Sequence, residues 1–492
     1  MLPVNGEKRG ANGTAFRSRK RVRSPRVPED DILPQMKQRI LSRRTFLASA
    51  SLTLRAATPS PNILFLLADD QRADTIAALG NPAIRTPHLD SLVRRGMVMR
   101  NAYCLGGNVP AVCTPSRNMI LSGRCFTRYQ GLASGDDPNF AVSMSAAGYE
   151  TYHHGKRGNS AVKIQEKFEH NKYLNDQDAR RAGDPGRVIT DAALEFLKTR
   201  KTDRPFFAYL AFETPHDPRV PRAEDLASYD PKEIPLPGNF LPVHPFDNGE
   251  QTVRDELLAP WPRTPDEIRR QLREYYAVIT GLDRQIGRLL DALNSRPEYA
   301  NTVVIFSADQ GLAVGSHGLM GKQSLYDHSM KSPLLFAGPG IPRGESNALV
   351  YLMDIYPTVL DLIGSSKPAG LDGESFLPAL RKKSPAHRQD LFLAYREVQR
   401  ALRDDRYKLI IYPKINHRQL FDLRHDPDER TDLSGKPEHR ERIRTMTAGI
   451  RDWQKKLADP HPLESANPAP REFVPPTGEA LREVRKRWNM AN

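Results

Sequence analysis

Two short apolar segments, each ending in acidic or amide side chains, constrain the fold of this chain most strongly. "PNILFLLADD" (residues 61–70) and "TVVIFSADQG" (residues 302–311) are near-continuous hydrophobic runs that stop at polar groups. Runs of this kind are typical of strands that are buried on both faces of a parallel sheet. In open α/β sheets, ligands bind at the carboxyl ends of such strands. The chain is therefore predicted to be an α/β protein whose site lies where these two strands end.

Other segments fit the same architecture. "RPFFAYLAFETPHDP" (residues 204–218) predicts a third buried strand, and shorter strands are expected near 148–154 and 333–337. The clearest helix spans 264–294, because "TPDE" opens it with a capping box and a proline at the first helical position. A further helix is expected at about 187–199.

This alternation predicts one large, mainly parallel sheet sandwiched by helices over residues 61–385. From residue 386 to 460 the sequence pattern changes to that of short strands joined by polar turns, followed by a helix near 437–457. This pattern predicts a smaller C-terminal subdomain with an antiparallel sheet and a helix. Residues 461–492 are rich in proline and are expected to wrap around the body or to dangle. Residues 1–60 are interpreted as a disordered basic leader.

The leader carries more than half of the net charge of +14, since residues 1–44 hold twelve Lys and Arg but only four Asp and Glu. The remaining body is modestly basic, which suits anionic substrates and gives no reason to expect nucleic-acid binding. "SRRTFLASASLTLRAAT" (residues 42–58) resembles a Tat-type export signal around Arg43 and Arg44, so a periplasmic or extracellular location is expected, with Met36 as the natural start. A simple disordered leader is the alternative. No apolar run is long enough for a membrane span.

Four oxygen-bearing side chains follow the two acid-tipped strands: Asp69, Asp70, Asp309 and Gln310. If the strands are neighbours, these groups converge on one point. Carboxylate and amide oxygens suit a hard cation, Ca²⁺ or Mg²⁺, better than zinc. The alternative is that the acids only cap strands and helix starts. The sequence predicts a divalent-cation site at this edge of the sheet.

A cysteine lies at a predicted helix start in "AVCTPSRNMILSGR" (residues 111–124). Thr114 is expected to be the N-cap and Pro115 the first helical residue. Cys113 would then lie where free backbone N–H groups and the helix dipole favour negative charge. A side chain there can attack or hold an anion, whereas the alternative is that Cys113 is a small buried hydrophobe.

These motifs together resemble the type I sulfatase family. "CTPSRNMILSGR" is similar to its signature, C-x-P-x-R followed by an apolar turn and T/S-G-R, and "NILFLLADDQRADTIAALG" precedes it as in that family. "NPAIRTPHLDSLVRRGMVMRNAYC" and "LFDLRHDPDERTDL" also resemble sulfatase segments, so the resemblance runs from about residue 61 to 455. It implies an alkaline-phosphatase-like fold and hydrolysis of sulfate esters.

The resemblance also implies how such a site works. In sulfatases a maturation enzyme oxidises the motif cysteine to formylglycine, and the hydrated aldehyde attacks the sulfur of the ester. Carried over, Cys113 is the formylglycine precursor, the nucleophile and a metal ligand, while Arg117 holds the hydrate. The remaining ligands of a Ca²⁺ ion, or of Mg²⁺, would be Asp69, Asp70, Asp309 and Gln310.

Basic side chains complete the set that the resemblance implies. Lys156, in "HHGKRGNS", would bind the sulfate oxygens, and His216, in "TPHDP", would be the acid for the leaving alcohol. In "SHGLMGKQSLYDHS", Lys322 would bind sulfate and the leaving group, and His317 would line the substrate pocket.

Two positions depart from the family pattern. Gly158 stands where the family has a histidine that helps to expel sulfate, and His153, His154 or a residue elsewhere is a candidate replacement. Gln310 stands where many relatives carry Asn or His, although its carbonyl oxygen still suits a cation.

The resulting prediction is a sulfatase that acts on sulfated carbohydrate, with arylsulfates and choline sulfate left open as substrates. One alternative is a phosphoester or phosphonate monoester hydrolase of the same superfamily. Another is a non-catalytic binder of sulfated glycans, which the intact Cys113, Arg117 and Lys322 argue against.

Overall fold

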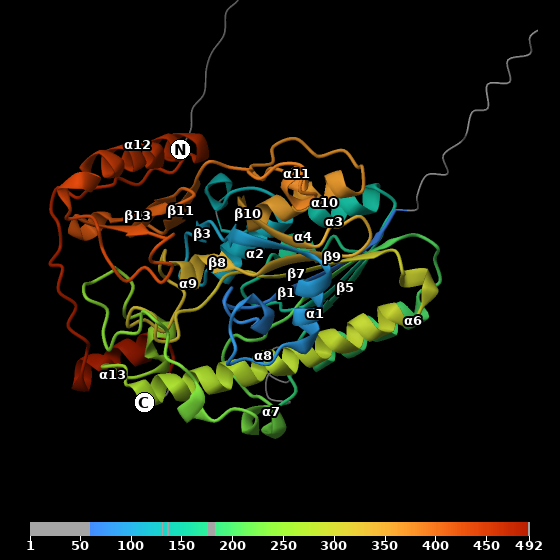
Figure 1. The fold of residues 1–492 in the computed structure, drawn as a ribbon, viewed down its shortest axis with the longest axis horizontal. Helices are drawn as coiled ribbons and strands as arrows, with labels where there is room; N and C mark the ends of the chain where they lie inside the picture. Colours follow the sequence, from blue (N-terminus) through green and yellow to red (C-terminus); the bar gives the residue numbers. More distant parts are fainter. Residues whose placement is uncertain (1–59, 130, 135–136, 176–182, 491–492) are drawn as a thin grey trace, which may run out of the picture. The chain divides into compact units, whose positions relative to one another are not determined.

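The computed structural model describes residues 60–129, 131–134, 137–175 and 183–490 (Figure 1). The Tat-type signal expected at Arg43 and Arg44 and the start expected at Met36 lie outside the described residues. Within the described part of the chain, none of the helices combines the length and the apolar character needed to cross a bilayer.

A large, mostly parallel sheet forms the centre of the molecule, as the sequence predicts. The order of its strands is β10 (Gly344–Tyr351), β2 (Met97–Tyr103), β9 (Leu334–Ala337), β7 (Thr302–Ala308), β1 (Asn62–Ala68), β6 (Phe206–Ala211), β4 (Glu150–Gly155) and β5 (His170–Tyr173). The short β8 (Lys331–Ser332) pairs with β2, and β9 is antiparallel to both of its neighbours. The two acid-tipped strands, β1 and β7, lie side by side and parallel.

Helices cover both faces of this sheet. The helices of the described residues are α1 (Pro87–Arg95), α2 (Cys113–Ser122), α3 (Phe140–Ala146), α4 (Val162–Gln165), α6 (Arg187–Thr199), α7 (Ala223–Ala227), α8 (Pro265–Asn294), α9 (Asp327–Met330), α10 (Ile355–Leu362), α11 (Leu377–Leu380), α12 (Arg440–Leu457) and α13 (Gly478–Arg487). Thr264 caps α8 by accepting a hydrogen bond from the Glu267 backbone N–H at 3.3 Å, as its capping box predicts.

The side chains of β1 alternate between two hydrophobic cores. Ile63 and Phe65 share one core with α2, α3 and α10, whereas Leu64 and Leu66 share the other with α1, α6 and α8. A strand that is buried on both faces must be apolar at every position, which explains the continuous run in its sequence. The polar residues that follow it are therefore held at a rigid, buried edge.

A second, smaller sheet lies towards the C-terminus. Its order is β14 (His417–Asp422), β13 (Tyr407–Tyr412), β12 (Gln399–Arg403), β11 (Leu391–Tyr395) and β3 (Gly106–Gly107). The four C-terminal strands are antiparallel and α12 packs on β12, which confirms the predicted fold class. Beyond α12 a long connection leads to a further helix, α13, which the sequence analysis did not predict (Figure 1).

Candidate active site

The ends of β1 and β7 bring the predicted acidic side chains together. Ala68 pairs in register with Ala308, so the residues that follow the two strands are neighbours. The Asp70 backbone N–H donates to Asp309 Oδ1 at 3.0 Å. Asp70 has a left-handed backbone conformation with φ of 65°, which is rare for a residue with a side chain, and the Tyr275 hydroxyl donates to its carbonyl oxygen at 2.5 Å. Surrounding contacts thus hold a strained residue in place.

Helix α2 begins at Cys113, which corrects the predicted helix start. Thr114 is not the N-cap and Pro115 is not the first helical residue, because the Ser116 N–H already donates to the Val112 carbonyl at 3.0 Å. Proline is tolerated inside the first turn because N–H groups there have no partner within the helix. Cys113 therefore occupies the first turn itself, at the positive end of the helix dipole.

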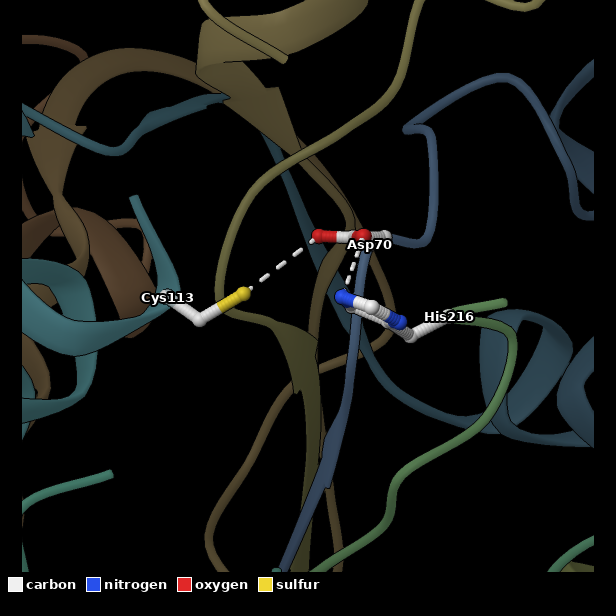
Figure 2. A group of neighbouring side chains, drawn as sticks. All are labelled: Asp70, Cys113 and His216. Carbon is white, nitrogen blue, oxygen red and sulfur yellow. Dashed lines mark hydrogen bonds and ion pairs between the residues drawn. The ribbon is translucent and has the colours of Figure 1, made fainter. Parts of the chain in front are cut away.

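The Cys113 side chain lies among the strand-end groups. Its sulfur is 3.1 Å from Asp69 Oδ1 and 3.6 Å from Asp70 Oδ1, and it accepts hydrogen bonds from Gln310 Nε2 at 2.9 Å and Lys322 Nζ at 3.2 Å. Figure 2 shows the sulfur and the imidazole of His216 pointing towards the same carboxylate of Asp70.

The Cys113 thiol is held in its protonated form. Its side chain is completely buried, and burial together with the negative charges of Asp309 and Asp69 raises its pKa well above the ordinary value of a thiol. Cysteine nucleophiles need a lowered pKa, because the thiolate is the reactive form. In the absence of a cation, these surroundings favour the neutral thiol over the thiolate.

Arg117, one helical turn after Cys113, pairs with two of the acids. Its Nε donates to Asp309 Oδ2 at 2.8 Å, and one terminal nitrogen lies 3.6 Å from Asp69 Oδ1. Burial opposes the charged form, but Asp309 and Asp69 outweigh it, so the pKa of Arg117 lies well above its usual range. Its other terminal nitrogen is buried and has no hydrogen-bond partner among the described residues.

Two lysines face the same carboxylates. Lys156 Nζ donates to Asp69 Oδ2 at 2.5 Å, and Lys322 Nζ donates to the two Asp70 oxygens at 2.8 and 2.7 Å. Burial lowers the pKa of each lysine, but the surrounding negative charges together raise it by more, with Asp69 the largest contributor at Lys156 and Asp70 at Lys322. Both ammonium groups are therefore charged at neutral pH.

His216 approaches Asp70 from the loop after β6. Its Nδ1 lies 2.6 Å from the Asp217 carbonyl oxygen, an arrangement in which Nδ1–H donates and Nε2 faces Asp70 Oδ2 at 3.8 Å. Burial, together with the positive charge of Lys322, lowers the pKa of His216. The backbone carbonyl thus selects the tautomer, and Nε2 is the nitrogen that can exchange a proton with a bound molecule.

The donor set fits a hard divalent cation. Ligand atoms of Asp69, Asp70, Cys113 and Asp309 all lie within 4.8 Å of one another. Gln310 turns its Nε2 towards the cluster and donates to Asp70 Oδ1 at 2.5 Å, while its buried Oε1 has no hydrogen-bond partner among the described residues; exchange of the two ends of the amide would present an oxygen of the kind that binds calcium. Burial and the negative charge of Asp69 raise the pKa of Asp309. A bound cation would offset this repulsion between the carboxylates.

A cavity of about 390 Å³ opens beside this cluster. Among the residues that line it are Lys156, Gly158, His216 and Lys322, so the position that lacks the family histidine faces the open space. The volume lies within the range of about 300–1,000 Å³ that is usual for small-molecule sites. The lysines and His216 are therefore accessible to a ligand on one side and bound to the acids on the other.

Three predicted or candidate histidines lie elsewhere. The ring of His317 stacks on Tyr326 at 3.9 Å between centroids, and its Nε2 lies 2.9 Å from the Glu429 carbonyl oxygen, so it packs between loops and does not line the cavity. His153 is buried against Tyr209, and His154 belongs to the same strand, β4. Neither of these two residues lines the cavity in the described part of the chain.

The structure adds residues to the site that the sequence analysis missed. Arg254 and Asp255 line the cavity, and Asp255 accepts hydrogen bonds from Arg254 at 2.9 Å and from Gln323 Nε2 at 2.8 Å. Trp488, in the C-terminal tail, lines the cavity as well. Nothing local in the sequence marks these residues, because their place depends on how distant segments pack.

Comparison with known families gives two matches. The model of the sulfatase family, described as "Sulfatase", matches residues 61–365, which is more than half of the chain. A second model, described as "N-sulphoglucosamine sulphohydrolase, C-terminal", matches residues 315–456.

Characterised relatives match over most of their length. An N-acetylglucosamine-6-O-sulfatase of Bacteroides thetaiotaomicron is 26% identical, over 85% of this chain and 90% of that protein. An ulvan-active sulfatase of Formosa agariphila is 26% identical, over 82% of each.

Solved structures share the fold. One, described as in complex with its substrate D-glucosamine-2-N,6-O-disulfate, has a TM-score of 0.70 and 23% identity, covering 82% of this chain and 100% of that one. The phosphonate monoester hydrolase of Agrobacterium radiobacter also has a TM-score of 0.70, with 18% identity, covering 81% of this chain and 96% of that one.

Proposed function

The chain belongs to the sulfatase family and is a sulfuric ester hydrolase, and from this premise we propose that it removes sulfate from sulfated carbohydrate through a formylglycine made from Cys113 and a bound divalent cation. The reaction adds water across the ester, releasing an alcohol and sulfate. The roles below follow from the contacts of individual side chains.

The surroundings of Cys113 carry this proposal. Its sulfur lies 3.1 Å from Asp69 and 3.2 Å from the Lys322 ammonium, yet its pKa is raised, so the thiol itself is a poor nucleophile. Formylglycine at this position supplies a hydrated aldehyde whose oxygen attacks sulfur. Arg117, held by Asp309 at 2.8 Å, is placed to offset negative charge at residue 113.

The proposed cation is Ca²⁺, with Mg²⁺ as the alternative. Asp69, Asp70, Asp309 and Gln310 would hold it together with residue 113, and their oxygen atoms are those that hard cations prefer. When bound, such an ion polarises the sulfuryl group and lowers the pKa of the attacking hydroxyl.

Lys156, Lys322 and His216 are proposed to handle the substrate. The two lysines are charged, buried and border the cavity, which suits them to bind sulfate oxygens and to balance the charge that develops on the leaving oxygen. His216 Nε2 is the atom through which a proton reaches the leaving alcohol. At Gly158 the chain offers space in place of the family histidine.

Three further points belong to the proposal. The names of the relatives, an N-acetylglucosamine-6-O-sulfatase and an ulvan-active sulfatase, support sulfated carbohydrate as the substrate class. A formylglycine-generating maturation enzyme is the partner that the mechanism requires. Export to the periplasm or beyond follows from the twin arginine at Arg43 and Arg44.

Sulfate release from N-acetylglucosamine-6-sulfate and from 4-nitrophenyl sulfate tests the function, on protein co-expressed with a formylglycine-generating enzyme. We expect Cys113→Ala to abolish release. The matched control Cys125→Ala, which alters another buried cysteine outside the cluster, should retain it. A phosphonate monoester in the same panel tests the alternative, and faster hydrolysis of that ester than of either sulfate ester would overturn the proposal.

A further inference from the structure

We propose that Trp488, carried at the end of α13, forms a sugar-binding wall of the active-site cavity and makes the C-terminal tail part of the substrate site. The inference rests on the proposed function and deepens it, because it names the element that recognises the leaving alcohol as a carbohydrate ring. Trp488 lies beyond residues 61–456, the part of the chain that the two family models match.

The tail is tied along the body before it reaches the cavity. Ser465 and Asn416 exchange two hydrogen bonds, at 2.8 and 2.9 Å. The Ala469 N–H then donates to the Lys414 carbonyl at 2.8 Å. Successive backbone contacts of this kind fix the direction of an extended segment that has few apolar residues of its own.

The tail next joins the segment that precedes α8. The Arg471 carbonyl accepts a hydrogen bond from the Asp247 N–H at 2.8 Å, and Phe473 packs against Trp261 at 6.0 Å between ring centroids. From there the chain enters α13, whose buried side chain is Val484. The route delivers the end of the helix to the cavity side of residues 247–261.

Trp488 is held in a defined orientation at the cavity. Its indole Nε1–H donates to the Thr252 carbonyl at 2.9 Å, and the residue is half-buried. It lines the same cavity as Lys156, His216 and Lys322, the side chains proposed to act on the sulfate group. An aromatic ring that is fixed at one edge and open on another side is a preorganised contact surface.

The chemistry of this wall fits a sugar. An indole offers a broad, rigid apolar face, which suits the C–H face of a pyranose ring. Beside it the cavity presents Arg254, Asp255 and Gln323, which can exchange hydrogen bonds with ring hydroxyls. The lysines suffice to bind the sulfate group. The additional presence of Trp488 with Arg254, Asp255 and Gln323 therefore indicates that this wall recognises the alcohol part of the ester.

The test compares a sulfated sugar with inorganic sulfate on matched variants. We would measure kcat and KM for N-acetylglucosamine-6-sulfate and the inhibition constant of inorganic sulfate, for Trp488→Ala, Trp488→Phe and Val474→Ala. Val474 belongs to the same tail, but its side chain is exposed and does not line the cavity among the described residues. Loss of an aromatic contact predicts that Trp488→Ala raises KM by about tenfold.

The inhibition constant of sulfate and the KM of the control variants should stay close to the values of the parent protein. The inhibition constant of sulfate should not change in Trp488→Ala, Trp488→Phe should recover most of the lost affinity, and Val474→Ala should keep the parental KM. The inference is overturned if Trp488→Ala leaves KM unchanged, if sulfate inhibition weakens in parallel, or if Val474→Ala reproduces the effect.

The outcome is separable from that of the proposed function. Hydrolysis of 4-nitrophenyl sulfate without hydrolysis of any sulfated sugar would leave the sulfatase chemistry standing and overturn the sugar-binding wall. No hydrolysis of any sulfate ester would refute the proposed function, and the inference would fall with it.

Discussion

Two buried clusters of charge in this protein look alike but do different work. The first is the Cys113 cluster. It is formed by Cys113, the acids at the ends of β1 and β7, and the cations that face these acids, Arg117, Lys156 and Lys322. The second is the Lys408 cluster, formed by Lys408, Asp327, Glu429 and Tyr103. Both are buried and both border a cavity, so neither burial nor an adjacent cavity distinguishes them.

In the Lys408 cluster the ammonium group is fully partnered, while the buried Glu429 Oε1 forms an ion pair with it but has no hydrogen bond among the described residues. Lys408 Nζ lies 3.1 Å from the Leu325 carbonyl and 2.6 Å from one oxygen each of Asp327 and Glu429, which matches its three protons. The Tyr103 hydroxyl reaches both Asp327 oxygens at 2.9 Å. The cluster connects β13 of the small sheet to β2 of the large one, which is a structural task.

The Cys113 cluster differs in what it leaves open. It holds a side chain that can be converted into a nucleophile, and it keeps Gln310 Oε1 and one Arg117 nitrogen without partners among the described residues. Its lysines touch both the acids and the cavity. The comparison teaches that a convertible side chain beside cations that also face a cavity, and neither charge burial nor an unpartnered polar atom, marks the candidate catalytic site.

The largest effect is expected for the structural cluster. Lys408→Met removes the cation from two buried carboxylates, and breaking a buried pair in this way costs about 3–5 kcal/mol of stability. Urea unfolding measures the change. Activity per folded molecule should stay close to that of the parent protein, and a large fall in kcat without loss of stability would show that the two clusters are not functionally distinct.

In the Cys113 cluster, removal of a cation should reduce activity more than stability. Lys322→Ala removes a cation beside the reacting group, and we expect kcat for a sulfate ester to fall about 10²- to 10³-fold. The free energy of unfolding should fall by less than in Lys408→Met, because Lys322 is paired with one carboxylate, that of Asp70, whereas Lys408 is paired with two. Equal losses of stability in the two variants, with activity retained in Lys322→Ala, would contradict the assignment.

Stabilisation by bound Ca²⁺ should depend on the carboxylates of the Cys113 cluster and not on those of the Lys408 cluster. Added Ca²⁺ at a hundredfold excess over its dissociation constant should stabilise the parent protein by about 2.7 kcal/mol. Asp309→Asn should lose this increment, whereas Asp327→Asn, in the Lys408 cluster, should keep it. Thermal unfolding in chelator and in Ca²⁺ measures both. An increment that survives in Asp309→Asn would place the ion elsewhere.

The smallest effect concerns His317, which borders the Lys408 cluster. Burial lowers its pKa to about 4, whereas the unfolded value is about 6.5. Between these values the unfolded chain binds more protons, so stability falls as the pH falls from 6.5 to 4.

His317→Phe should reduce that acid sensitivity at a cost of about 1–2 kcal/mol at pH 7, from loss of the hydrogen bond to the Glu429 carbonyl. Urea unfolding at pH 7 and pH 5 measures the difference. KM should not change. A raised KM with unaltered stability would restore His317 as a substrate-binding residue.

The sequence predicts the strands at the centre of the fold, because they depend on local pattern, and it predicts the meeting of the acids on the condition that two of these strands are neighbours. The runs before Asp69 and Asp309 have the pattern of buried strands, and the structure supplies their pairing as β1 and β7. The helix over 187–199 and the capping box at Thr264 also have local signals.

Other features depend on contacts between distant segments. The contact of His317 with the Glu429 carbonyl and that of Trp488 with the Thr252 carbonyl each join segments more than a hundred residues apart. The start of α2 was misjudged because Thr114 and Pro115 satisfy cap and first-turn preferences in more than one register.

The mass of the peptide that contains Cys113 tests the central claim most directly. We would isolate the protein after co-expression with a formylglycine-generating enzyme, confirm that it hydrolyses a sulfate ester, and measure the peptide by mass spectrometry. The account predicts loss of one sulfur and two hydrogens with gain of one oxygen, as the thiol side chain becomes an aldehyde. An active enzyme whose Cys113 remains an unmodified thiol would contradict it.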